Sequence, residues 1–244
     1  MKINGNFSIN DKNFADWFNQ DFRLTYPQFF PHFISGEGFG VLMENLPNLT
    51  GKSEITLNEF CGHMAIIYNE TGGTCKPIRE MGGPQYMFNT VMPGGGVKYS
   101  YNTPPNHKAG DQLMEWGIIN TEEQRSLWNG TIYPKHAPED IKKAALKCDF
   151  YRFRGYGFNQ LTWRNAYEQC LQPLLPRPMD EYSVEEFEAH INNVKIAAQA
   201  FSIISTKMPM PKINTDLVSG NFRPMVCGSG IGLYVTQYCS VMHT

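Results

Sequence analysis

Glu70 is the residue whose place in the sequence most clearly indicates chemistry. It ends an apolar-patterned segment and is followed by Thr71, Gly72 and Gly73. Either glycine can take the left-handed conformation that stops a helix, so Glu70 is expected in a last helical turn. A carboxylate is unfavourable there, because that end of the helix dipole is negative. A carboxyl group at such a position, beside open glycine backbone, is typical of a catalytic proton donor; a solvated helix-end glutamate would show the same pattern.

A second stretch, residues 151–167, combines aromatic rings, arginines and amide side chains. Gly155 and Gly157 stand on either side of Tyr156, where they let the backbone bend sharply or approach a ligand closely. Aromatic faces can stack on sugar rings. Side chains able to hydrogen-bond sugar hydroxyls and acetamides are Gln160, Thr162 and Asn165. The composition is equally typical of a buried strand–turn–helix with an aromatic core.

Together the two stretches resemble the signatures of the family-19 glycoside hydrolases. The first signature is a glutamate followed by a small residue and two glycines, as at residues 70–73. The second is close to Arg-Gly-Arg-Gly-(aromatic or Pro)-Ile-Gln-Leu-Thr and ends in Asn-Tyr, as at residues 154–167. The resemblance covers about residues 54–170. Either motif alone is weak, but both in this order are fairly specific.

That family holds plant-type chitinases and phage endolysins that cleave peptidoglycan, on a lysozyme-like fold. This chain departs from its usual pattern where Asn69 replaces His, Tyr156 replaces Arg and Asn159 replaces Ile. These departures bear on the substrate more than on the chemistry. In the chitinase branch the second glutamate lies about twenty residues after the first, where this chain has Met92, so the endolysin branch is favoured.

The resemblance implies an inverting hydrolysis by two carboxylates that stand about 6.5–9.5 Å apart, leaving space for a water. Glu70 would be the acid and Glu80 the base, with Thr162 holding the attacking water. The alternative for Glu80 is a salt bridge with Arg79 or Lys76. The side chains expected to bind substrate are Arg154, Tyr156, Gln160, Trp163 and Asn165.

Helix signals predict the elements that position these residues. Thr56 and Glu59 form a capping box before an apolar stripe, so a helix is expected to run from there to Glu70. Residues 82–107 are rich in Gly, Pro and Asn and are predicted to form a long loop that walls the groove. Further helices are predicted over 11–24 with Asp11 as cap, 109–117, 121–128, 138–147 and 183–205.

The fold class expected is mainly α: a lysozyme-like helical domain with a small β-hairpin or loop lobe and a substrate groove. Residues 1–50 would form an N-terminal aromatic helical arm packed on the core. Residues 51–206 would form the catalytic domain, and residues 207–244 a C-terminal extension without an assigned role. A chain of 244 residues with 41% apolar residues can build such a core.

Composition limits the partners. The net charge of −2 does not indicate nucleic acid binding, and no segment has the length and apolarity of a membrane span. The six cysteines lack metal-ligand spacing, so no metal or other cofactor is expected. They are read as buried thiols, with up to three disulfides left open. The first residues show no secretory signal, which favours synthesis in the cytoplasm and holin-type release or injection to the cell wall; any delivery or immunity partner stays unknown.

The function expected is hydrolysis of β-1,4 bonds in peptidoglycan by an endolysin-like, bacteriolytic glycosidase. A chitinase is one alternative. A lytic transglycosylase, which needs a single acid, is another. The alternative outside enzymes is a glycan-binding or structural protein that keeps the groove.

Overall fold

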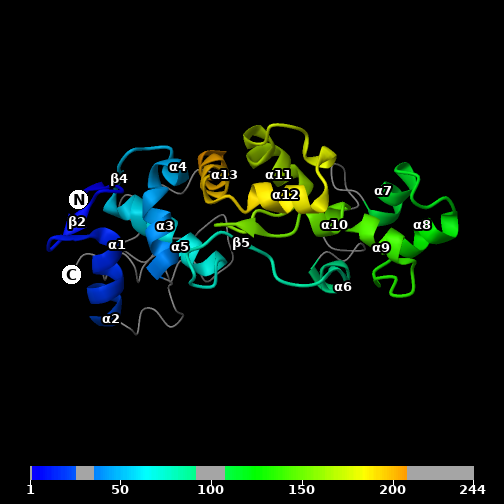
Figure 1. Ribbon diagram of the computed structural model, residues 1–244, viewed down its shortest axis with the longest axis horizontal. Coiled ribbons are helices and arrows are strands. Elements are labelled where there is room, and N and C mark those ends of the chain that lie inside the picture. Colours follow the sequence, from blue (N-terminus) through cyan, green and yellow to red (C-terminus); the bar gives the residue numbers. More distant parts are fainter. Residues whose placement is uncertain (1, 26–35, 92–107, 208–244) are drawn as a thin grey trace. The chain divides into compact units, whose positions relative to one another are not determined.

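The computed structural model describes residues 2–25, 36–91 and 108–207, and these are mainly helical (Figure 1). The prediction of a mainly α protein is therefore confirmed for this part of the chain. The chain divides into two compact units. Unit 1 holds the described residues within 1–78, 157–160 and 191–244, and unit 2 holds those within 79–156 and 161–190.

Unit 1 is built from short strands and helices near the N-terminus and from two longer helices, α5 and α13. Its elements are β1 (Lys2–Ile3), β2 (Ser8–Ile9), β3 (Lys12–Asn13), α1 (Phe14–Trp17), a π-helical turn (Phe18–Phe22), α2 (Arg23–Thr25), α3 (Gly36–Glu44), α4 (Leu46–Thr50), β4 (Ile55–Thr56), α5 (Leu57–Glu70) and α13 (Val194–Lys207). Strand β1 pairs antiparallel with β4, and β2 pairs antiparallel with β3.

The aromatic N-terminal segment packs against α5. The rings of Phe18 and Phe39 stack with centroids 4.3 Å apart, and Phe14 meets Phe60 of α5 edge to face at 5.3 Å. All four side chains are buried, so they supply much of the apolar contact of unit 1. The predicted start of this helix at Asp11 is wrong. Asn13 is the cap, because its side chain accepts the Asp16 N–H at 2.9 Å.

Helix α5 follows its prediction at both ends. The N–H of Thr56 donates to Glu59 Oε2 at 2.9 Å, and the N–H of Glu59 donates to Thr56 Oγ1 at 3.3 Å, which completes the capping box. The helix ends at Glu70. Gly72 and Gly73 then have φ of +59° and +78°, the left-handed conformation expected of a glycine stop.

Unit 2 is a set of short helices around a second core. Its elements are β5 (Ile78–Arg79), α6 (Pro84–Tyr86), a π-helical turn (Met87–Val91), α7 (Ala109–Glu115), α8 (Glu122–Trp128), α9 (Glu139–Ala145), α10 (Asp149–Arg152), β6 (Tyr156–Gly157), α11 (Arg164–Cys170), 3₁₀ turns at Gln172–Leu174 and Met179–Glu181, and α12 (Val184–Ile191). Strands β5 and β6 form a two-stranded sheet, and the unit boundary runs through both.

The three short helices predicted over 109–147 are confirmed as α7, α8 and α9. They pack around Trp128, Leu113 and Ile141, which are buried together. The predicted loop 82–107 is wrong for its first part, because residues 84–91 are helical and Phe88 belongs to the same core. The rest of the predicted loop, residues 92–107, lies outside the described residues, so its expected role as a wall of the groove stays a prediction.

The long helix predicted over 183–205 is wrong, because the structure breaks it into α12 and α13. Asn193 causes the break. Its side chain accepts the N–H groups of Lys195 and Ile196 at 2.9 and 3.2 Å, which starts a new helix with its own cap. The apolar stripe continues through Ile191 and Phe201, so periodicity alone did not reveal the interruption.

The predicted domain division stays a prediction, and the C-terminal extension lies outside the described residues from 208 onward. Within the described part, no helix combines the length and the apolarity that crossing a bilayer requires.

Candidate functional site

Glu70 is presented by a firmly held turn in unit 1. Thr71 is buried, and its hydroxyl donates to the Ile67 carbonyl at 2.6 Å and accepts the Cys75 N–H at 3.0 Å. The N–H of Gly73 donates to the carbonyl oxygen of Tyr68 at 2.8 Å. The carboxylate of Glu70, itself partly exposed, therefore stands on backbone that hydrogen bonds hold on both sides.

Glu80 is attached to the second signature inside unit 2. Its N–H donates to the carbonyl oxygen of Gly155 at 2.7 Å, and the N–H of Gly155 donates to Glu80 Oε2 at 3.1 Å. The predicted alternative, a salt bridge with Arg79 or Lys76, is wrong. Arg79 binds Glu188 and Lys76 binds Glu37. One oxygen of the Glu80 carboxylate is thus held by backbone, which fixes the orientation of the carboxylate group.

Directly behind Glu80, a buried network of charges holds the second signature in place. Arg79 donates to both carboxylate oxygens of Glu188, at 3.0 and 2.8 Å, and to the hydroxyl of Tyr167 at 2.5 Å. Tyr167 in turn donates to the carbonyl oxygen of Arg154 at 2.5 Å. Arg154 completes the network with a 3.1 Å ion pair to Glu188. One carboxylate thus serves two guanidinium groups that are largely removed from water.

The pKa values in this network follow from burial and pairing. Burial alone would raise the pKa of Glu188, but Arg79 and Arg154 lower it below its usual value. Burial would also lower the pKa of Arg79, yet Tyr167 and Glu188 raise it. The pKa of Arg154 is lowered by burial first and by Arg79 second. The network is therefore fully charged near neutral pH.

Two residues predicted to bind substrate, Arg154 and Tyr156, lie inside unit 2. The Tyr156 side chain is 2% exposed, and burial raises the pKa of its hydroxyl. Its ring lies 6.0 Å from the ring of Tyr167 and 6.0 Å from the guanidinium carbon of Arg79. Its hydroxyl has no hydrogen-bond partner among the described residues. In this structure both side chains shape the support behind Glu80, and their contact with a sugar stays a prediction.

The remaining predicted residues are divided between the units. Thr162, partly exposed Trp163 and exposed Asn165 lie in unit 2 with Glu80, whereas Gln160 lies in unit 1 with Glu70. Trp163 has φ of +78° and its N–H donates to the Phe153 carbonyl at 2.9 Å. The Gln160 amide donates to the Ile78 carbonyl at 3.3 Å. The meeting of Glu70 with Glu80 and Thr162 across a cleft stays a prediction.

A second charged network, which runs from buried Asp149 and Arg164 to exposed Asp180, was not expected from the sequence. Asp149 is fully buried, accepts the Gln112 amide at 2.6 Å and binds Arg164 at 2.9 Å. Arg164 also makes a two-pronged contact with Asp180 at 2.8 and 2.9 Å. These four residues are far apart in sequence and follow no motif, so no local signal could have linked them.

No group of His, Cys, Asp or Glu suited to a metal ion occurs among the described residues. Cys75, Cys148 and Cys170 are buried free thiols. No protein-family model, no curated protein and no solved structure matches this chain.

Proposed function

We propose that the protein hydrolyses β-1,4 glycosidic bonds in an N-acetylated glycan, most simply peptidoglycan, with Glu70 as acid and Glu80 as base. The lysozyme-like fold and the substrate groove belong to this proposal. The observation that carries it is the pair of hydrogen bonds between Glu80 and Gly155, 2.7 and 3.1 Å long. They join the residue expected as base to the motif expected to line the sugar site.

The local geometry of each carboxylate supports the assigned role. Glu70 ends a capped helix, and the exposed Gly72 two residues later has no side chain and open space where a Cβ would stand. Glu80 presents one oriented oxygen, as activation of a water requires. The network of Arg79, Glu188 and Arg154 keeps the backbone under Glu80 rigid.

The decisive experiment compares purified peptidoglycan and purified chitin as substrates for the wild-type protein and two variants. Glu70→Gln and Glu80→Gln should each lower turnover by about 10²- to 10⁴-fold, because each removes one proton-transfer step. Glu123→Gln, an exposed glutamate with the same change of charge, is the matched control and should keep full activity. Proton NMR of the first products should show the inverted, α anomer.

The outcomes separate the alternatives. Release of soluble fragments from chitin but not from peptidoglycan would identify a chitinase. Products with anhydro-sugar ends, together with full activity of Glu80→Gln, would identify a lytic transglycosylase. Glycan binding without turnover in any variant would identify a binding or structural protein and refute the proposal.

A further inference from the structure

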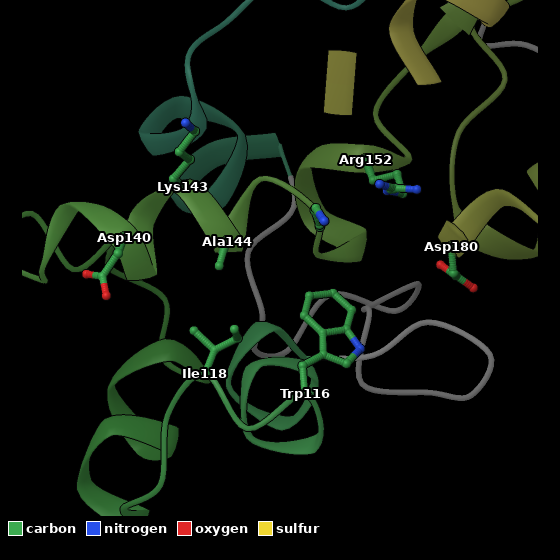
Figure 2. Close-up of a pocket in the computed structure, with 8 residues that line it drawn as sticks. Trp116, Ile118, Asp140, Lys143, Ala144, Arg152 and Asp180 are labelled. Atoms are coloured by element: carbon green, nitrogen blue, oxygen red, sulfur yellow. The ribbon is translucent and has the colours of Figure 1, made fainter. Parts of the chain in front are cut away.

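A pocket of about 520 Å³ opens on unit 2, away from Glu80 in the sequence and built from different residues. It is drawn in Figure 2. The residues that line it are Trp116, Ile118, Asp140, Lys143, Ala144, Lys147, Arg152 and Asp180. They come from the segment after α7, from α9 and its C-terminal end, from α10 and from the 3₁₀ turn at Met179–Glu181. The glycosidase proposal uses none of them.

One side of the pocket is an apolar surface that is open to solvent. Trp116 is 40% exposed and Ile118 is 43% exposed. Each would therefore bury apolar area if a flat group bound against it. Figure 2 shows Ile118 beside Trp116 with Ala144 facing them, and the nitrogen-bearing edge of Trp116 directed toward the end where Arg152 and Asp180 lie. This end therefore offers an indole N–H donor next to an apolar wall.

At the polar end, the arginines and the aspartates balance, so the net charge depends on the lysines. Arg152 is 3% exposed and donates to the carbonyl oxygens of Met179 and Tyr182, which carry no charge to balance it. Arg164 already holds both Asp180 and Asp149. These two arginines and two aspartates sum to zero, so the lysines of the lining decide the sign.

The lining holds three cations, Lys143, Lys147 and Arg152, against two carboxylates, Asp140 and Asp180. Neither lysine forms an ion pair with another described residue. Lys147 directly precedes the Cys148–Arg152 segment, whereas in Figure 2 the Lys143 chain extends away from Trp116. We therefore take Lys147 as the cation that contacts the ligand. Lys143 contributes positive charge only at a longer distance. Burial lowers the pKa of Arg152, while the nearby carboxylates of Asp180 and Asp149 oppose this shift.

We propose that this pocket binds a small organic anion whose flat apolar part stacks on Trp116 and Ile118 and whose carboxylate or phosphate lies against Lys147. An apolar wall beside donors and an unneutralised cation matches such an amphipathic anion and disfavours a cation or a neutral sugar. The pocket lies within one unit, so its composition does not depend on the glycosidase proposal.

The test is calorimetric titration of the full-length protein with 2-naphthoate, using neutral 2-naphthylmethanol as the matched probe. Naphthoate should bind with one site per chain, and the alcohol should bind at least about tenfold more weakly, because it lacks the charged group that contacts Lys147. Lys147→Gln should remove that difference. Trp116→Ala should weaken both probes.

Lys142→Gln is the control variant, because Lys142 lies on α9 five residues before Lys147, pairs with Glu139 and is not part of the lining. It should keep the wild-type affinity for naphthoate within about twofold. Absence of naphthoate binding at about 5 mM would overturn the proposal. Equal affinity for acid and alcohol, or an equal effect of Lys147→Gln and Lys142→Gln, would overturn it as well. Repeating the titration with 2-naphthyl phosphate then shows whether the pocket binds a phosphate more tightly than a carboxylate.

Discussion

At the scale of single residues, Glu188 has the largest electrostatic role near the candidate site. It is the shared counter-ion of Arg79 and Arg154, while both arginines also bind backbone carbonyl oxygens of residues 151–154. Removing the carboxylate would leave two guanidinium groups without a counter-charge in a largely dry environment. Such a residue can be essential without touching a substrate.

Glu188→Gln should lower the free energy of unfolding by about 2–3 kcal/mol, less than the about 3–5 kcal/mol typical of a fully buried pair because its side chain is 24% exposed. Urea denaturation followed by circular dichroism measures this. Glu185→Gln, an exposed glutamate on the same helix, should shift stability by less than about 0.5 kcal/mol. Similar losses in the two variants would contradict the role given to Glu188.

At the scale of elements, the turn that presents Glu70 is packed closely against α3. A Cβ atom added at Gly38 would overlap the carbonyl oxygen of Thr74, whereas one added at Gly40 would meet nothing within 4 Å. Gly38 therefore lets helix and turn approach each other, and Gly40 on the same helix does not. The placement of Glu70 consequently depends on a glycine more than thirty residues earlier in the chain.

Gly38→Ala should destabilise unit 1 by about 1–3 kcal/mol, because the overlap is with backbone and can be relieved only by moving the turn. It should also reduce turnover in the same assay that tests Glu70→Gln. Gly40→Ala should be neutral or stabilise by up to about 1 kcal/mol, since alanine is the better helix former. Thermal unfolding of both variants decides; a Gly38→Ala protein as stable and active as Gly40→Ala would refute the close approach.

At the scale of the whole molecule, stability should depend on pH through His63, a partly exposed histidine of unit 1 whose Nδ1 atom is buried. His63 on α5 packs edge to face on Phe201 of α13, with ring centroids 5.5 Å apart. Its Nδ1 has no hydrogen-bond partner among the described residues. Burial lowers the pKa of His63 from 6.5 to about 4, with a smaller opposing effect of Glu59 and a further lowering by Lys52.

Because the folded-state pKa of His63 is lowered, the unfolded chain binds the proton first as pH falls. The free energy of unfolding is therefore unaffected by His63 above pH 6.5. It falls as the pH drops from 6.5 to about 4, by at most about 1.4 kcal/mol per pH unit. His63→Gln should remove this part of the pH dependence in urea denaturation. His136→Gln, an exposed histidine, should keep the wild-type curve. Parallel curves for wild type and His63→Gln would contradict the buried neutral state.

The sequence by itself determined the local elements with strong end signals. The capping box of Thr56 and Glu59, the glycine stop after Glu70 and the short helices of residues 109–147 follow from hydrogen bonds between near neighbours. The break at Asn193 was local as well, but a continuous apolar stripe concealed it.

Only the tertiary structure decided which distant charges meet. The partnership of Arg79 with Glu188, the docking of Glu80 on Gly155 and the contact of Asp149 with Arg164 join residues 15 to 109 positions apart. No periodicity encodes such pairs, because they depend on how helices and strands pack rather than on the spacing within any one of them. The burial of Tyr156 and Arg154 has the same origin. The types of these residues suggested contact with a ligand. Packing instead places Tyr156 near Tyr167 and pairs Arg154 with Glu188 inside unit 2.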